Sequence, residues 1–334
     1  MSATTVVSDE QRQQGEARRR SIRTVYGLDD KMFFRLLLIG ALSILFITLA
    51  IGLFLALKST SAIKEAKFSF LTTQQWQPDV HKFGIGAVLP GTVFIALVAL
   101  VVSFPLGLGV ALFISEIVRG RLQRYLQFGI DAMAAVPSVV YGLFGLLWVE
   151  QHSVGVSRWI STWFGWVPFL KVPGANGSLT AFSASTFIAG LIVAVMMIPI
   201  EASIMREAFS QAPAGEREGA FALGATRWGM IRSVVLPFGR GGIIGGTMLA
   251  LGRALGETVA VLFIISPVQK INWHILSSGG NSIAALIANL YSEASAFGLS
   301  ALMAAGLALF IMTMIVNFTA SAIISRSRSG AISE

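Results

Sequence analysis

Two charged residues lie inside a long apolar stretch, LALGRALGETVAV, and they could do one of two kinds of chemistry. Arg253 and Glu257 are the only charges between Gly241 and Ser266, a run long enough to cross a bilayer as a helix. Residues four apart share a helix face, so the pair could neutralise itself and join packed helices. Alternatively, the guanidinium could bind an oxyanion in a membrane path, because its donors match phosphate geometry. Insertion scales give a buried membrane charge a cost of about 2.5 to 3.5 kcal/mol, so we expect the pair to have a use.

A second stretch, EREGAFALGATRWGMIRSVVLP, extends from Glu216 to Pro237. It predicts a short helix that ends near Gly224, a turn, and a second helical segment that carries Arg227 and Arg232 and stops at Pro237. Such an element could dock in a groove of another protein or lie as an amphipathic loop on anionic lipid.

Three further carboxylates lie near predicted span ends. We expect Asp131, Glu116 and Glu201 to form structural pairs, with Arg119 and Arg206 within reach, rather than to act in transport.

Signatures of catalysis are scarce. The chain has no cysteine, and its three histidines, at positions 81, 152 and 274, are isolated, so no metal site is predicted. No Gly-Lys dipeptide occurs, which excludes a Walker A phosphate loop. We therefore expect no enzyme and no cofactor bound by this chain, and any ATP and Mg²⁺ would be used by partner subunits.

The composition predicts the elements that position these residues. Of 334 residues, 54% are hydrophobic and 13% are charged, as in an integral membrane protein. Six apolar runs predict an all-α protein with six transmembrane helices, at 32–57, 87–114, 126–148, 183–205, 242–265 and 299–324. Pro105, Pro137 and Pro199 lie inside these runs and predict kinks.

Basic residues set the predicted orientation. The terminal segments and the loops that share their side hold seventeen Lys and Arg residues, against seven in the alternate loops. The positive-inside rule therefore places both termini in the cytoplasm. Because the basic residues flank apolar runs, the net charge of +8 indicates membrane orientation and lipid contact rather than nucleic-acid binding. We expect a basic cytoplasmic tail at residues 1–31, the first helix at 32–57, an outer loop at 58–85 and a membrane domain at 86–325 that includes a cytoplasmic loop at 206–240.

The predicted outer loops contain two further signals. Six tryptophans are expected to anchor the chain at the membrane interface: Trp76, Trp148, Trp159, Trp163, Trp166 and Trp273. The run NSIAALIANLY is apolar but too short to span, so it predicts a re-entrant or interfacial helix.

The second stretch resembles the signature loop of binding-protein-dependent ABC importer permeases. That pattern is E-A-A, three residues, G, nine residues, I-x-L-P, and the chain departs from it mildly at Gly219 and Val234. The resemblance implies a type I permease fold and a helix that docks in an ATP-binding subunit. The residues that carry this coupling role are Glu218, Gly219, Ala220, Gly224, Leu236 and Pro237.

Three more segments, VPSVVYGLFGLLW, MMIPIEASIMREAF and GRALGETVAV, resemble phosphate importer permeases of the PstC type more than the PstA type. Glu201 departs from that pattern, because a neutral residue is expected after the Pro-Ile pair. The likeness implies that Arg253 and Glu257 act in the substrate path. We hypothesise that Arg253 takes phosphate as its transient counter-ion, while Glu257 holds the guanidinium when the path is empty.

This resemblance implies a permease subunit in a bacterial inner or plasma membrane. Its partners would be a second, PstA-type permease, two ATP-binding subunits and an extracytoplasmic phosphate-binding protein, and the assembly would work by alternating access. The residues are also compatible with two other functions: a permease for sulfate, molybdate or phosphonate, or a membrane scaffold for phosphate signalling.

Overall fold

The chain divides into two units of unequal size, which are described separately. A computed structural model describes residues 27–174 and 178–328. The first unit covers residues 1–51 and the second covers residues 52–334. Of the predicted basic tail, only the end from Gly27 lies within the described residues.

Helix α2 (Leu28–Lys58) is the predicted first span and begins slightly before Met32. Asp29 and Asp30 lie in its first turn and Lys58 in its last, so each charge has the sign that the helix dipole favours. The residues between are largely apolar, and many point outward; Phe46, for example, is 72% exposed. A helix that is apolar on all sides suits a lipid environment.

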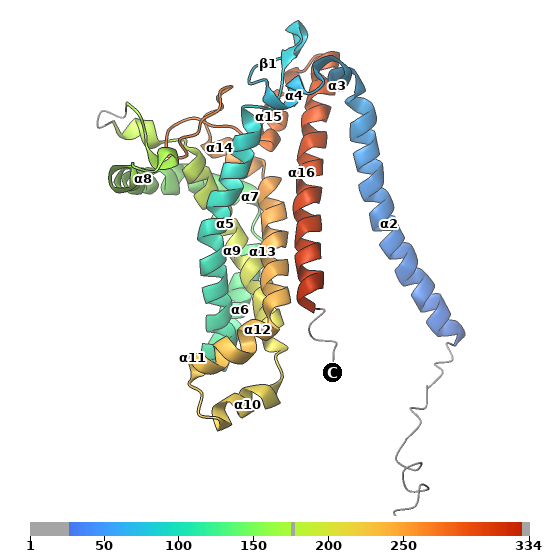
Figure 1. Cartoon of the computed structure of the whole chain (residues 1–334), viewed down its shortest axis with the longest axis vertical. Helices are drawn as coiled ribbons and strands as arrows, with labels where there is room; N and C mark the ends of the chain where they lie inside the picture. Colours follow the sequence, from blue (N-terminus) through green and yellow to red (C-terminus); the bar gives the residue numbers. More distant parts are fainter. Residues whose placement is uncertain (1–26, 175–177, 329–334) are drawn as a thin grey trace, which may run out of the picture. The chain divides into compact units, whose positions relative to one another are not determined.

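Helices form most of the described part of the second unit (Figure 1). Those after α2 are α3 (Thr60–Ala66), α4 (Ser69–Thr72), α5 (Val88–Leu112), α6 (Arg121–Ala134), α7 (Ser138–Phe144), α8 (Glu150–Phe164), α9 (Thr186–Ser210), α10 (Ala214–Ala222), α11 (Arg227–Met230), α12 (Leu236–Phe238), α13 (Arg240–Leu255), α14 (Val259–Ile264), α15 (Ile283–Leu290) and α16 (Ala296–Arg328). Strands β1 (Trp76–Gln77) and β2 (Lys82–Phe83) pair antiparallel. Three π-helical turns continue α5, α7 and α11: η2 (Phe113–Ile117), η3 (Gly145–Val149) and η6 (Ile231–Val235). Turns of 3-10 helix are η1 (Pro78–Val80), η4 (Pro168–Leu170), η5 (Leu179–Phe182) and η7 (Tyr291–Glu293).

Helices α5, α9 and α13 form the centre of this unit, and α16 lies beside α13 (Figure 1). Their core includes Ile95 of α5, Ile192 and Met197 of α9, and Ala254 of α13. Glycine permits the closest approach, because a Cβ atom at Gly190 of α9 would lie 2.6 Å from the side chain of Val98. The two helices therefore approach more closely than larger residues would allow.

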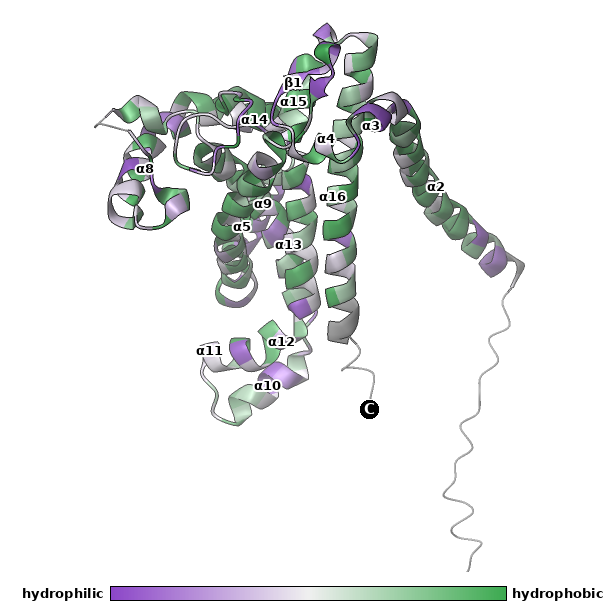
Figure 2. Cartoon of the chain, turned by 45° about the horizontal axis from the view of Figure 1, so that its top comes forward, coloured by the Kyte–Doolittle hydropathy of each residue, from purple (hydrophilic) through white to green (hydrophobic). Residues whose placement is uncertain are grey.

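Four of the predicted membrane spans are continuous helices, and the other two fall on bent helix pairs. Within residues 27–174 and 178–328, four helices are long and apolar enough to cross a membrane, and two bent helix pairs raise the number to six if each pair is one span. Apolar residues line α5 and α16, whereas hydrophilic residues gather on α3 and α10 (Figure 2). The structure is thus an all-α membrane fold.

The third predicted span is bent where proline predicts a kink. Helix α6 and the helix from Ser138 to Phe164 meet at 92°. Pro137 precedes Ser138 with an extended backbone, and it has no N–H to continue the α6 hydrogen-bond pattern. Pro105 and Pro199 instead lie within the continuous helices α5 and α9.

The expectation of one helix from 242 to 265 is wrong. Helix α13 ends at Leu255, and α14 starts only at Val259. Gly256 follows α13 directly, and glycine weakens a helix by about 1 kcal/mol relative to alanine. The bent pair that contains α13 joins it, at 67°, to residues 227–238 instead.

Near one end of α5 lie β1, β2, α8 and α15, and near its other end lie α10 to α12 (Figure 1). Helix α15 has eight residues, which confirms that this apolar run is too short to span. The expected anchoring role is wrong for Trp76, which is 8% exposed and packs in a core with Phe83 and Leu302. The other five predicted tryptophan anchors include Trp166, which is 80% exposed.

Candidate functional site

Arg253 and Glu257 lie on either side of the end of α13, so they do not share a helix face. Glu257 is buried, and its Oε1 accepts a hydrogen bond from the backbone N–H of Ala260 at 3.2 Å. Its own N–H donates to the carbonyl of Ala254 at 3.2 Å. The predicted ion pair between Arg253 and Glu257 is therefore wrong for this structure. The Glu257 carboxylate instead accepts a backbone hydrogen bond in the first turn of α14.

Arg253 is exposed in the last turn of α13, where the helix dipole favours a cation. Among the described residues it forms no ion pair within 4.0 Å and no side-chain hydrogen bond. Its charge interacts electrostatically with the hydroxyl group of Tyr141 on α7. That hydroxyl donates to the carbonyl of Met133 at 2.8 Å, at the end of α6. The guanidinium thus lies near the break between α6 and α7 with its donors unused.

Two of the segments that carry the resemblance pack directly against each other. A Cβ atom at Gly142 of α7 would lie 2.9 Å from the Cα atom of Ala260 on α14. A Cβ atom at Gly145 would lie 2.7 Å from Ile192 and 2.8 Å from Ile264. Glycines of the segment VPSVVYGLFGLLW therefore bring α7 and η3 against α14 and α9, and they place both helix breaks in one region.

The structural pairing expected for Asp131 is present, and its partner is Arg206. Arg206 Nη2 lies 3.7 Å from Asp131 Oδ1, and Ser203 Oγ donates to the same oxygen at 2.8 Å. These contacts join α6 to α9. The Asp131 side chain is about half exposed, so the ion pair contributes little stability, about 0 to 1 kcal/mol.

Glu201 has a hydrogen bond but no ion pair among the described residues. It is 0% exposed on α9, and its Oε1 accepts from Ser103 Oγ of α5 at 3.1 Å. A Cβ atom at Gly107 would lie 2.8 Å from its Oε2, so the glycine provides the space that this carboxyl group occupies. The contact belongs to the α5–α9 interface, not to the helix breaks.

Glu116 forms a structural pair as expected, but its partner is neither Arg119 nor Arg206. Its carboxylate lies in η2 at the end of α5, with a side chain that is 2% exposed. Arg217 Nη1 of α10 donates to Glu116 Oε2 at 2.7 Å. This partnership was missed because 101 residues separate the two positions. The only signal was the position of Arg217 directly before Glu218 in the predicted coupling stretch.

The coupling loop, residues 206–240, has the predicted form of two helical segments and a turn. Helix α10 ends before Gly224, whose φ of +81° is the left-handed conformation that glycine adopts readily. Gly224 N–H donates to the carbonyl of Phe221 and Ala225 N–H donates to that of Ala220, which is a Schellman motif. Thr226 then caps α11 by accepting from the N–H of Gly229.

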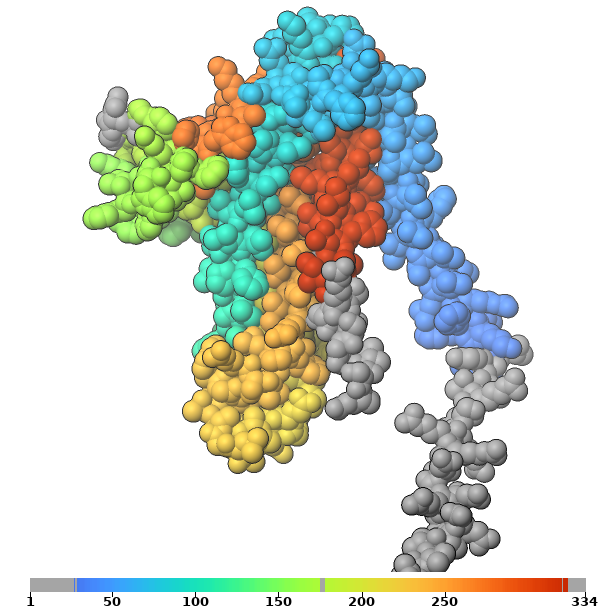
Figure 3. Space-filling model, in the orientation of Figure 1, coloured from blue at the N-terminus to red at the C-terminus, as the bar shows by residue number. Residues whose placement is uncertain are grey.

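The second segment of the loop continues through Pro237 to Phe238, one residue beyond the predicted end. The six predicted coupling residues differ in exposure. Glu218, Gly219, Gly224 and Pro237 are exposed, whereas Ala220 and Leu236 are partly buried against a core cluster. The loop forms a distinct lobe at the end of α5 and α13 in the space-filling view (Figure 3).

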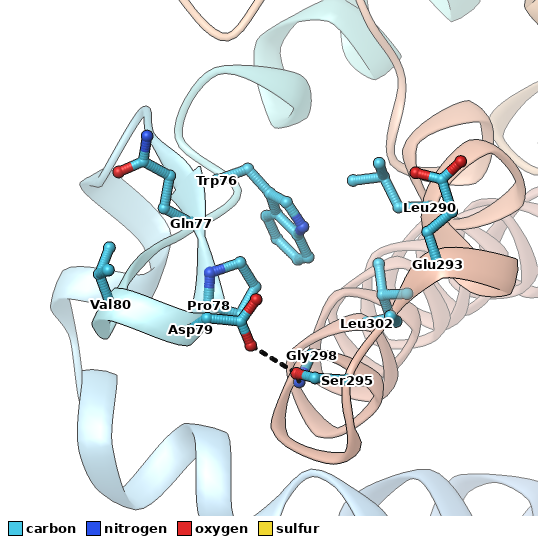
Figure 4. A pocket seen from close by; sticks show the side chains of 11 residues that line it. Trp76, Gln77, Pro78, Asp79, Val80, Leu290, Glu293, Ser295, Gly298 and Leu302 are labelled. Carbon is cyan, nitrogen blue, oxygen red and sulfur yellow. Dashed lines mark hydrogen bonds between the residues drawn. The ribbon is translucent and has the colours of Figure 1, made fainter.

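A cavity of about 470 Å³ lies at the opposite end of the second unit, between η1 and the start of α16 (Figure 4). Asp79 and Glu293 line it together with the indole of Trp76. Asp79 Oδ1 accepts a hydrogen bond from Ser295 Oγ at 2.6 Å. Two carboxylates would repel an oxyanion, so this cavity does not suit phosphate.

Comparisons with known proteins agree with these features. The family described as "Binding-protein-dependent transport system inner membrane component" matches residues 103–329. The chain is 38% identical over 250 residues to a phosphate transport system permease protein PstC of Pasteurella multocida, covering 75% of this chain and 77% of that protein. It is 33% identical to a protein of the same name from Mesorhizobium japonicum, covering 92% of this chain and 94% of that protein. A crystal structure of a bacterial ABC transporter involved in the import of alginate has a similar fold, with a TM-score of 0.56 and 17% identity over 92% of this chain and 97% of that chain.

Proposed function

The chain belongs to the binding-protein-dependent transport system inner membrane component family, and we propose that it is the PstC-type permease subunit of an ATP-driven phosphate importer. The observation that supports a substrate path is the guanidinium of Arg253, which is exposed at a helix break and has no counter-ion among the described residues. The fold, the family and this free cation support one function. That function is to provide part of a path for a small anion.

Phosphate would interact with Arg253 through charge-assisted hydrogen bonds. A guanidinium presents parallel donors that match two phosphate oxygens, and it stays charged at any physiological pH. Glu257 would contribute indirectly, since its bond to Ala260 N–H fixes the start of α14 beside Arg253. Conduction requires binding that is weak enough for release. A single exposed arginine of one subunit, completed by groups of a second permease, would meet that requirement.

The coupling loop would dock a partner ATPase. Three large apolar side chains on it are exposed: Phe221 is 47% exposed, Leu223 is 90% exposed and Trp228 is 61% exposed. A short helix with exposed aromatic and aliphatic residues suits a groove in another protein. Since the sequence lacks the Gly-Lys dipeptide of a Walker A loop, ATP and Mg²⁺ would be bound by that partner, and this chain would catalyse no reaction.

The orientation follows from the same proposal. The coupling loop holds five Lys and Arg residues and would face the cytoplasm together with both termini. The end that carries β1, β2 and α15 would then face a phosphate-binding protein on the outside of a bacterial inner or plasma membrane. A second, PstA-type permease would complete the path, and two ATPases would drive alternating access.

Uptake of radiolabelled phosphate tests the path. The assay uses cells that lack other phosphate importers and carry wild type, Arg253→Gln or Arg253→Lys at matched membrane levels. Loss of a hydrogen bond to a charged group costs about 1.5 to 3 kcal/mol, so uptake should fall by about tenfold to a hundredfold in Arg253→Gln. Arg253→Lys should also lose uptake, because an ammonium group lacks the guanidinium fork.

The matched control is Arg158→Gln, which removes the same charge from an exposed position on α8. Wild-type uptake that excess sulfate does not reduce supports phosphate as the substrate, whereas competition by sulfate indicates a broader oxyanion permease. Full uptake by Arg253→Gln would show that this arginine is structural. No uptake by wild type would point to another oxyanion or to a signalling scaffold.

A further inference from the structure

We propose that Arg217 is the positioning residue that transmits movement of the coupling helix α10 to the two central membrane helices, α5 and α9. This inference rests on the proposed function, because it assumes that a partner ATPase moves the coupling loop. It goes beyond docking: it identifies one side chain inside this subunit through which the movement is transmitted.

The guanidinium of Arg217 uses all three of its nitrogen atoms. Nη1 donates to Glu116 Oε2 at 2.7 Å, Nε to the carbonyl of Ala212 at 3.2 Å, and Nη2 to the carbonyl of Phe209 at 2.5 Å. Glu116 belongs to the π-helical turn that ends α5, and Phe209 belongs to the last turn of α9. One side chain of α10 is therefore bonded to the ends of two central helices.

The bond to Glu116 satisfies a group that would otherwise be costly to bury. The Glu116 side chain is 2% exposed, and its second oxygen has no hydrogen bond among the described residues, so Arg217 is the cation that neutralises it. The carbonyls of Phe209 and Ala212 lie at the C-terminal end of α9, where the helix dipole favours a positive charge. The planar guanidinium binds these acceptors in fixed directions, which a lysine could not do.

Helix α10 depends on this contact more than the rest of the loop does. The later segment of the loop has an apolar attachment, because Met230, Ile231 and Val235 are buried in a cluster with Met205 and Phe209 of α9. Helix α10 has no buried residue, and only the partly buried Ala220 packs at the edge of that cluster. The polar bonds of Arg217 are therefore the main connection between α10 and the membrane helices.

Loss of Arg217 should separate ATP hydrolysis from transport. The Schellman motif at Gly224 defines the end of α10 without Arg217, so the helix can still form and present its exposed apolar residues to the ATPase. Movement of α10 would no longer be delivered to α5 and α9. The expected change is a larger number of ATP molecules hydrolysed for each phosphate imported.

The test uses the complete transporter, with both permeases, the ATPase and the binding protein, reconstituted in vesicles. Phosphate uptake and ATP hydrolysis are measured together for wild type and Arg217→Gln. We expect the ratio of ATP hydrolysed to phosphate imported to rise by roughly twofold to thirtyfold, the range for loss of a contact in a coupling network. The matched control is Arg124→Gln on α6, outside the coupling loop. It removes an exposed arginine whose side chain has no hydrogen bond or ion pair among the described residues.

A double variant separates coupling from assembly. Arg217→Gln alone leaves Glu116 buried without a cation, and this could reduce the amount of assembled transporter. Arg217→Gln combined with Glu116→Gln removes both charges, so assembly should recover while the ratio stays high. Recovery of a normal ratio in the double variant would mean that the pair is only structural and would overturn the inference.

The outcomes also separate this inference from the proposed function. Normal wild-type phosphate uptake with an unchanged ratio in Arg217→Gln would overturn the coupling role and leave the function intact. A proportional fall in hydrolysis and uptake would have the same meaning, because coupling would be preserved. Absence of phosphate uptake by the wild-type complex would overturn the proposed function together with the role that rests on it.

Discussion

Ionisable side chains have opposite surroundings in two regions of the molecule: the interface between α5 and α9, and the break between α13 and α14. At the interface, Glu201 is fully buried and bonded to Ser103 of the same chain. At the break, Arg253 is exposed, and its side chain has no hydrogen bond or ion pair among the described residues. A charge that is buried and bonded within the chain serves packing, whereas an unused cation in a membrane protein is available to a ligand or a partner. We therefore propose a packing role for the first region and a transport role for the second.

The largest stability effect is expected at the interface. A Cβ atom at Gly190 would lie 2.6 Å from Val98 and 3.2 Å from the carbonyl oxygen of Ile95, so Gly190→Ala would force α5 and α9 apart. Overpacking of this kind costs about 1 to 3 kcal/mol. The melting temperature of the purified protein in detergent should fall. Gly109→Ala is the control on α5, since nothing lies within 4 Å of a Cβ atom there, and an unchanged melting temperature in Gly190→Ala would contradict the close packing.

A smaller effect is expected at Glu257, where capping and pairing can be separated. Glu257→Ala removes the acceptor for Ala260 N–H, and loss of a cap costs about 0.5 to 2 kcal/mol. Glu257→Gln keeps an oxygen in the same place but removes the charge. The melting temperature should therefore fall in Glu257→Ala and stay close to the wild-type value in Glu257→Gln. If glutamine instead lowers phosphate uptake as far as Arg253→Gln does, Glu257 acts through its charge in the path.

The smallest effect is expected at Glu201. Glu201→Gln keeps the shape of the side chain and an acceptor for Ser103, and it removes a carboxyl group that has no cation among the described residues. Isosteric changes in a core usually cost less than about 1.5 kcal/mol, so stability and uptake should stay near wild type. The measurements are the melting temperature and phosphate uptake at matched protein levels. A severe loss of uptake with normal stability would show that Glu201 acts in transport rather than only in packing.

Much of the coupling loop could be predicted from local sequence. Gly224 indicated the end of α10, and the structure has the left-handed glycine and the Schellman bonds that such an end requires. Pro137 likewise indicated the bend between α6 and α7. Each of these features depends on the conformational range of one residue and on groups a few positions away. The prediction of a continuous helix from 242 to 265 was wrong because apolar composition alone does not distinguish one helix from two.

By itself, the sequence determined the membrane class of the protein, its apolar runs, the form of the coupling loop and the presence of an arginine within an apolar region. Hydrophobicity, proline and glycine act locally, so their effects can be read along the chain. Only the tertiary structure decided which charges have partners. In the structure, Glu257 accepts a hydrogen bond at the start of α14, and Glu116 pairs with Arg217, which is 101 residues away in the sequence. Arg253 has no counter-ion among the described residues. Ion pairs depend on which helix ends meet in space, and that follows from the packing of α5, α9 and α13.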